Sequence, residues 1–173
     1  MRRSAAAIVH AERMFTQELT DLARRIGTLL NERGETVGVA EGSAGGLISA
    51  TLLSIPGASA YYLGGAVIYT AAAGRAWMTG AVETPQGMRG ATDVFATYLA
   101  RSVAARLGAT WGLGEAGAAG PPNRYGDPAG HSWSAVAGPV ESSRQVLTGL
   151  GDRSDNMVAF AVAALGLFAE ALV

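Results

Sequence analysis

The chain has 173 residues, a length that favours one domain with its own hydrophobic core. Its formal net charge is −1 and it has no block of like charges, so it lacks the basic surface that nucleic-acid binding requires. It contains no cysteine and no lysine, which excludes disulfides, thiolate metal sites and nucleophiles of either type.

The first third of the chain predicts a helix, a strand and a second helix. Apolar residues recur with a helical period from about residue 10 to residue 33, and Gly34 follows as a natural end. The run TVGVA, residues 36–40, is typical of a short buried strand. A glycine-rich loop comes next and leads into an apolar helix over about residues 46–54.

The second third begins with a strand. The run YYLGGAVIYT, residues 61–70, is rich in aromatic and β-branched residues, and Gly64 and Gly65 indicate a bulge or a close backbone approach within it. A less regular helical stretch follows to about Met78, and TPQGM predicts another helical turn that begins at Thr84.

The next elements lead into the longest loop. A helix over about residues 92–107 ends at Gly108, and TWGLGEA, residues 110–116, predicts a strand. The stretch GAAGPPNRYGDPAGH that follows is dense in glycine and proline and therefore predicts a long loop. Loops of this length in a compact domain usually carry function.

The remaining pattern predicts the fold class. Strands near residues 132–137 and 144–148 suit a hairpin, and a closing helix begins near residues 152–155. Together these elements predict a single α/β domain, a three-layer α/β/α sandwich with a mixed sheet, in which a helical segment in residues 1–34 packs on the domain of residues 35–173. The two glycine-rich loops each follow a short apolar strand, so we expect them to meet at one sheet edge and form one pocket.

The first glycine-rich loop lies in GVAEGSAGGL, residues 38–47. Adjacent glycines at the start of a helix let backbone N–H groups point at a ligand, and the helix dipole favours an anion such as phosphate. Gly42, Gly45 and Gly46 do not have the spacing of a nucleotide-binding P-loop or of a dinucleotide fingerprint. The alternative is a tight turn in which Ser43 caps the helix.

Four side chains are candidates for catalysis. Ser43 is a possible nucleophile, and Glu41, Glu115 and His131 are possible bases beside it. Because both glutamates follow a short strand, they would form a carboxylate pair if they face one cleft, and one of them would have a raised pKa. The alternatives are that each glutamate caps a helix or pairs with an arginine, and that backbone groups satisfy His131.

Further side chains are candidates for ligand binding. Arg124 lies in the long loop, where its guanidinium is suited to hold a phosphate or carboxylate by two parallel hydrogen bonds, or is simply a solvated loop charge. Tyr69 and Arg75 follow the second strand, and Gly117 and Gly120 follow the third. We predict that these residues line the pocket.

Three ordered stretches are similar to a known family. VGVAEGSAGGLISATLLSIPGASAYYLGGAVIYT, GLGEAGAAGPP and GDRSDNMVAFAVAAL resemble the C-terminal domain of the CinA (competence/damage-inducible) proteins, from about residue 36 to the end. The resemblance implies an α/β/α domain, usually oligomeric. It also implies metal-free hydrolysis of the carboxamide of nicotinamide mononucleotide to the acid and ammonia.

The resemblance also assigns positions to the family's reactive residues. The serine taken as nucleophile in the family motif AESxTGG falls on Gly42, and Ser43 stands one position later. The family's lysine falls on Gly74, beside Arg75, and the threonine of its motif TGxAGP falls on Ala116. Arg75 cannot replace a lysine base, because a guanidinium stays protonated at any usable pH.

Two functions follow as hypotheses. The first is an amidohydrolase-like protein with altered or lost activity, with Ser43 as nucleophile and loop N–H groups near Gly45, Gly46 and Gly117 as oxyanion donors. The second is a non-catalytic ligand-binding or oligomeric assembly protein. In both cases we expect a small amide or nucleotide ligand, no cofactor, no metal, no nucleic acid and no membrane partner. We expect a cytoplasmic protein, because the sequence shows no signal-peptide pattern and no apolar window long enough for a membrane span. The apolar composition, 49% of the residues, suits close helix packing or the buried interface of a homo-oligomer.

Overall fold

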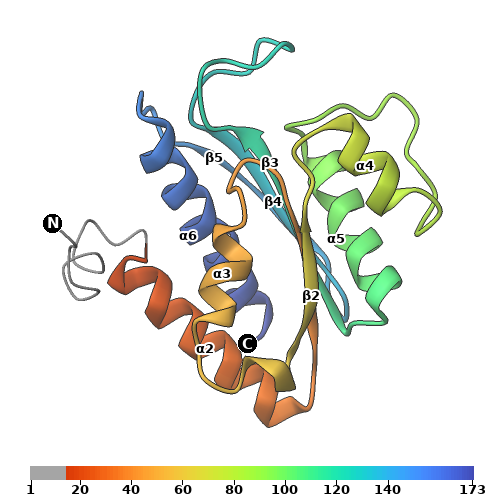
Figure 1. Ribbon diagram of the computed structural model, residues 1–173, viewed down its shortest axis with the longest axis vertical. Coiled ribbons are helices and arrows are strands. Elements are labelled where there is room, and N and C mark those ends of the chain that lie inside the picture. The colour runs from red at the N-terminus through yellow and green to blue at the C-terminus, as the bar shows by residue number, and fades with distance from the viewer. Residues whose placement is uncertain (1–14) are drawn as a thin grey trace, which may run out of the picture.

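A five-stranded sheet lies at the centre of the computed structural model, which describes residues 15–173 (Figure 1). Its strand order is β2-β1-β3-β4-β5. β1 runs parallel to β2 and β3, whereas β3, β4 and β5 are successively antiparallel, so the predicted mixed sheet is confirmed. The strands are β1 (Val37–Glu41), β2 (Tyr62–Val67), β3 (Trp111–Ala118), β4 (His131–Ala137) and β5 (Ser142–Leu147).

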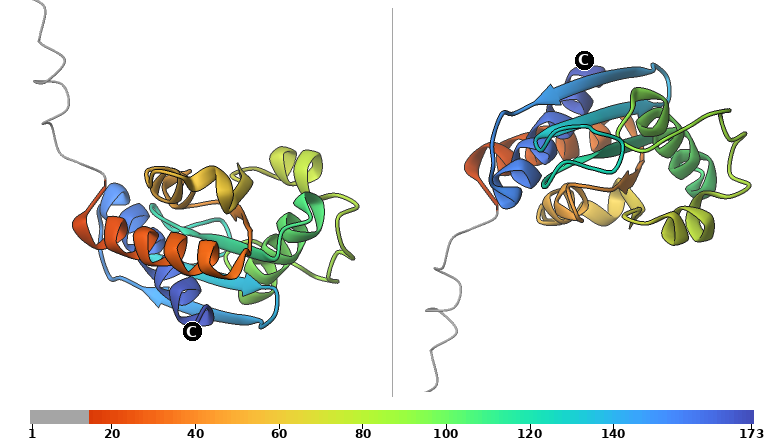
Figure 2. Two further views of the ribbon diagram at one scale, coloured as in Figure 1. Left: turned by 90° about the horizontal axis from the view of Figure 1, so that it is seen from below. Right: turned by 90° about the horizontal axis from the view of Figure 1, so that it is seen from above.

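Helices cover both faces of this sheet, which confirms the three predicted layers (Figures 1 and 2). On one face lie α2 (Gln17–Arg33), α3 (Leu47–Leu53) and α6 (Arg153–Ala171), and on the other lie α4 (Ala71–Met78) and α5 (Asp93–Leu107). A short 3₁₀ turn (Ala58–Ala60) precedes β2.

The first of these helices has clear end signals. Thr16 caps α2 by accepting a hydrogen bond from the N–H of Leu19 at 3.2 Å, and Gly34 ends it with a φ of 63°. The part of the predicted helix that precedes residue 15 lies outside the described residues.

The larger hydrophobic core lies between the sheet and the layer of α2, α3 and α6. Trp111 of β3 packs edge-on against Phe168 of α6, with ring centroids 5.7 Å apart. Within the described residues, α6 is the one helix long and apolar enough to cross a membrane by length and composition. Its Phe160, Leu165 and Phe168 are fully buried in this core, as expected of the central helix of a packed domain.

Glycines allow close backbone contacts in the central strands. The register between β1 and β2 shifts opposite Gly64, whose φ is 153°, and a Cβ on Gly65 would lie 2.7 Å from the carbonyl oxygen of Val39. The predicted bulge and close approach are therefore both present. Gly112 and Gly114 of β3 allow α5 to pack closely against the sheet. An added Cβ would lie 1.8 Å (Gly112) or 2.1 Å (Gly114) from a backbone carbonyl oxygen of α5.

One predicted element is wrong. The chain forms no helical turn at Thr84, and residues 79–92 are an irregular connection between α4 and α5. Gly87 and Ala91 adopt left-handed φ values of 66° and 57°, which interrupt helical hydrogen bonding. This connection forms a wall of the cavity described below.

Candidate functional site

The two glycine-rich loops begin side by side, as the sequence predicts. Glu41 at the end of β1 is paired in register with Glu115 of β3. The N–H of Gly42 then donates to the backbone carbonyl of Glu115 at 2.9 Å. Because β1 and β3 are parallel neighbours, the loops that follow them leave the same edge of the sheet.

Glu115 is fully buried beneath the first loop. Its Oε2 accepts the N–H groups of Gly42 at 3.2 Å and Ala44 at 2.8 Å, and its Oε1 accepts the hydroxyls of Ser43 and Ser132. Burial raises the pKa of Glu115 above its usual value and outweighs the hydrogen bonds from Ser43, Ala44 and Ser132, which lower it. The neighbouring charge of Glu41 raises this pKa further.

Glu41 occupies the N-terminal end of α3. Its Oε2 accepts the N–H groups of Gly46 and Ile48, both at 3.0 Å. Its Oε1 accepts the N–H of Ser49 at 2.9 Å and the Ser49 hydroxyl at 2.6 Å. The helix-capping alternative is thus the arrangement that Glu41 adopts, and these backbone donors are bonded to a carboxylate of the protein itself.

Ser43 and Gly42 face opposite sides of the loop. The Ser43 hydroxyl donates to the buried carboxylate of Glu115, and only 6% of Ser43 is exposed. A Cβ on Gly42 would instead lie 3.4 Å from the carbonyl oxygen of Ile68, on the side of the sheet covered by α4 and α5. The position that matches the family serine therefore faces Ile68, which is a cavity residue.

A cavity of about 600 Å³ lies on this second side, between α4, α5, residues 79–92 and the loop after β3. Four of the predicted site residues line it: Tyr69, Arg75, Gly117 and Arg124. The predicted residues Glu41, Gly42, Ser43, Gly45, Gly46, Glu115, Gly120 and His131 are not among its lining residues. Its apolar part is formed by Ile68, Met78, Met88, Phe95 and Tyr98.

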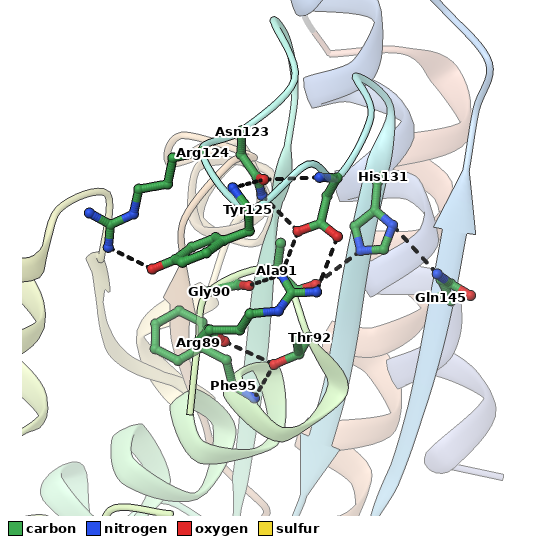
Figure 3. A network of polar contacts seen from close by, with 11 residues as sticks. Arg89, Gly90, Ala91, Thr92, Phe95, Asn123, Arg124, Tyr125, His131 and Gln145 are labelled. Carbon is green, nitrogen blue, oxygen red and sulfur yellow. Dashed lines mark hydrogen bonds and ion pairs between the residues drawn. The ribbon is translucent and has the colours of Figure 1, made fainter. Parts of the chain in front are cut away.

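An ion pair joins two walls of the cavity (Figure 3). Arg89 Nη1 and Nη2 donate to the two carboxylate oxygens of Asp127 at 2.6 and 3.2 Å. The hydrogen bond from Arg89 holds the pKa of Asp127 below its usual value. The guanidinium carbons of Arg89 and Arg124 lie 5.3 and 4.8 Å from the centre of the Tyr125 ring, within the range of a cation–π interaction.

Replacing Asp127 with asparagine is expected to lower the free energy of unfolding at pH 7 more than at pH 3. A carboxyl group whose folded pKa is depressed stabilises the fold above its usual pKa, near 3.8, and this contribution is lost as the pH falls through the folded pKa. Urea unfolding of both proteins at the two pH values measures the difference. An equal loss at both pH values would contradict this ionic contribution.

His131 contacts the backbone of Ala91, a residue of the irregular connection that lines the cavity. It is 7% exposed, its Nε2 donates to the carbonyl oxygen of Ala91 at 2.9 Å, and Gln145 lies 3.4 Å from its Nδ1 (Figure 3). Ala91 needs such support because its φ of 57° is unfavourable for a residue with a Cβ. The satisfied-histidine alternative matches this arrangement.

Arg153, at the start of α6, connects the ends of β2 and β3. It donates to the carbonyl oxygen of Gly120 and, at 3.1 Å, to the hydroxyl of Tyr69. Its guanidinium carbon lies 5.8 Å from the centre of the Tyr69 ring. Gly120 therefore contributes its backbone carbonyl to this contact and is not among the residues that line the cavity.

The cavity also uses residues that the sequence analysis did not select. Met88, Arg89 and Phe95 come from or beside the irregular connection, which the sequence pattern presents as a helical turn. The available signal was the arginine within a glycine-containing segment, but nothing local joins Arg89 to Asp127. In the part of the chain that the structure describes, no group of three or more acidic or histidine side chains is placed to hold a metal ion.

Comparisons with known proteins give consistent matches. The family model described as the CinA C-terminal domain matches residues 19–172. A CinA-like protein of Synechococcus elongatus is 34% identical over 120 residues, which cover 69% of this chain and 28% of that protein. A CinA-like protein of Synechocystis is 34% identical over 140 residues, 80% of this chain and 34% of the other. The chain thus matches about a third of the length of these relatives.

Solved structures share the fold. The competence/damage inducible protein CihA from Agrobacterium tumefaciens has a TM-score of 0.83 and 28% identity, with 93% of this chain and 99% of that chain covered. A CinA superfamily protein from Klebsiella pneumoniae has a TM-score of 0.82 at 23% identity, with 90% and 98% covered. The second likeness concerns the fold alone.

Proposed function

Because the chain belongs to the CinA C-terminal domain family, we propose that it binds a small nucleotide-like ligand in the cavity without hydrolysing it by serine–lysine chemistry. The composition of the cavity carries this proposal. Its apolar side chains suit a planar ring, and its arginines suit an anionic group. Among the described residues that line it there is no serine, lysine, histidine or carboxylate.

The replaced family positions support the absence of hydrolysis. Gly74, which matches the family lysine, lines the cavity, and Gly42, which matches the family serine, faces Ile68 at its border. Neither residue has a side chain that can attack an amide or accept a proton. Loss of a nucleophile and its base costs an enzyme several orders of magnitude in rate.

Ser43 does not compensate for Gly42 in this arrangement. Its hydroxyl is bonded to Glu115 on the opposite side of the loop, beneath backbone N–H groups that use the same carboxylate. A nucleophile must lie within hydrogen-bond reach of its base and about 3 Å from the reacting atom. Ser43 therefore holds the loop in shape in this proposal.

A ligand assay tests the proposal directly. Millimolar nicotinamide mononucleotide is expected to raise the Tm of the protein, since a ligand that binds the folded state stabilises it, while ammonia stays at background. Gly74→Phe, which fills the cavity from α4, should abolish the shift. No shift in the wild type would reject the binding proposal. Ammonia release that Ser43→Ala abolishes would establish the amidohydrolase alternative instead.

Restoring the family residues is expected to restore turnover. A Cβ has ordinary space at Gly42, where the nearest atom is 3.4 Å away, and at Gly74, where it is 3.8 Å away. Gly42→Ser combined with Gly74→Lys should therefore fold and release ammonia from nicotinamide mononucleotide. Gly42→Ser alone, which lacks the base, is the matched control and should stay at background.

A further inference from the structure

The charge of the cavity is not balanced by the protein. Three arginines line it, and Arg89 is neutralised by its two-oxygen contact with Asp127. Among the described residues, Arg75 and Arg124 form no ion pair, and no acidic side chain lines the cavity. A ligand therefore meets two uncompensated guanidinium groups.

These two guanidinium groups come from different walls. Arg75 belongs to α4, and Arg124 belongs to the loop after β3. Arg124 Nη2 donates to the Tyr125 hydroxyl at 2.5 Å, and its guanidinium carbon lies 4.8 Å from the centre of the Tyr125 ring. In Figure 3, Arg124 lies on the other side of Tyr125 from Arg89, and the ion pair of Asp127 is with Arg89.

Apolar side chains complete the cavity. Met78 and Tyr98 are almost fully buried, and Phe95 is half-buried beside them. An aromatic ring placed on this apolar surface loses contact with water, while ionic substituents remain within reach of the cavity's arginines. The cavity thus combines an apolar surface with cations from two of its walls.

We propose that the cavity selects an aromatic ligand with two anionic groups, so that it favours the carboxylate form of a pyridine mononucleotide over the carboxamide form. This inference rests on the proposed function. A phosphate and a ring carboxylate together match two guanidinium groups, each of which can donate two parallel hydrogen bonds to one anion. A neutral carboxamide leaves one guanidinium without an anionic partner.

Calorimetric titration of the full chain with nicotinate mononucleotide and nicotinamide mononucleotide measures the preference. At low salt the carboxylate form is expected to bind about tenfold more tightly, because one charge-assisted contact distinguishes the two ligands. The ratio should fall as salt screens the guanidinium groups. Equal affinities within about twofold would overturn the selectivity and leave the proposed function standing, whereas binding of neither ligand would overturn both.

Two variants locate the selectivity. Arg75→Gln and Arg124→Gln each remove one cation, and one of them is expected to abolish the preference for the carboxylate form while the other weakens both ligands equally. Arg24→Gln, an exposed arginine of α2 outside the cavity, is the matched control and should change neither affinity. Thermal melts of the variants without ligand check that each is folded. A preference that survives both cavity variants would overturn the proposal.

Discussion

Glu41→Gln is expected to lower the free energy of unfolding by about 2–3 kcal/mol, whereas Glu115→Gln should cost less than about 1 kcal/mol. Glu41 accepts three backbone N–H groups and one hydroxyl, divided between both oxygens. In a glutamine the NH₂ group must face at least one of these buried N–H donors, which leaves that donor without a partner.

Glu115 tolerates the same change because of how its partners are divided. Both backbone donors contact Oε2, and both serine hydroxyls contact Oε1. The glutamine oxygen can serve Gly42 and Ala44, while the NH₂ donates to the hydroxyl oxygens of Ser43 and Ser132. Glu115→Ala offers no such replacement, so we expect it to cost about 3–5 kcal/mol through unpaired donors and a cavity.

The pH dependence separates charge from shape at Glu115. Its folded pKa lies above the usual value near 4.5, so its contribution to stability is greatest at low pH and is lost as the pH rises through the raised pKa. As the pH rises from acidic to neutral, the wild type should lose this stabilisation whereas Glu115→Gln should not. The unfolding free energy of Glu115→Gln should therefore increase relative to that of the wild type over this pH range. Urea unfolding of the three variants provides both readouts. Equal losses for Glu41→Gln and Glu115→Gln would contradict the assignment of donors.

Gly114→Ala is expected to prevent stable folding or to cost more than about 3 kcal/mol. The added Cβ would lie 2.1 Å from the carbonyl oxygen of Ala96 and 2.7 Å from the backbone nitrogen of Ala100, both in α5. These are backbone atoms of a helix, so they cannot rotate away as the end of a side chain can. The helix would have to move off the sheet.

Gly42→Ala is the matched control for this substitution. Both glycines lie in buried backbone near the same sheet edge, but the nearest atom to a Cβ on Gly42 is 3.4 Å away. We expect a change of less than about 1 kcal/mol there, since reduced freedom of the unfolded chain offsets the slight crowding. Circular dichroism melts of both variants test the contrast. A stable Gly114→Ala protein would mean that α5 lies farther from β3 than the structure shows.

The fold could be predicted from the sequence because its signals are local. The run TVGVA contains β1 except for its last residue, Glu41, and the run YYLGGAVIYT contains all of β2. Gly34 and Gly108 end their helices with left-handed φ values, as expected of helix C-terminal glycines. The convergence of the two loops followed from the parallel pairing of neighbouring strands.

The site could be predicted only in part because its contacts join distant residues. Four predicted residues line the cavity: Tyr69 and Gly117 lie at the ends of strands at the predicted edge, whereas Arg75 lies in α4 and Arg124 in the loop after β3. The partners of Glu115, however, are set by the alternation of side chains along β3 and by the path of a loop more than 70 residues earlier. No local pattern shows which face Ser43 takes.

The remaining differences arose where backbone conformation depends on tertiary contacts. At Thr84 the sequence suits a helical turn, yet Gly87 and Ala91 take left-handed values, and Ala91 is held in that conformation by His131. The sequence predicts β3 as a strand but gives no local reason for its alternating glycines. Their role in admitting α5 appears only once the helix is in place.

The carboxylates beneath the first loop have a consequence for ligand entry. Because Glu41 and Glu115 already satisfy the amides of residues 42, 44, 46, 48 and 49, this segment is preorganised before any ligand arrives. Ordering this part of the backbone would therefore add little to the free-energy cost of binding a ligand. The same five amides should exchange their hydrogens slowly in the free protein and no more slowly in the complex.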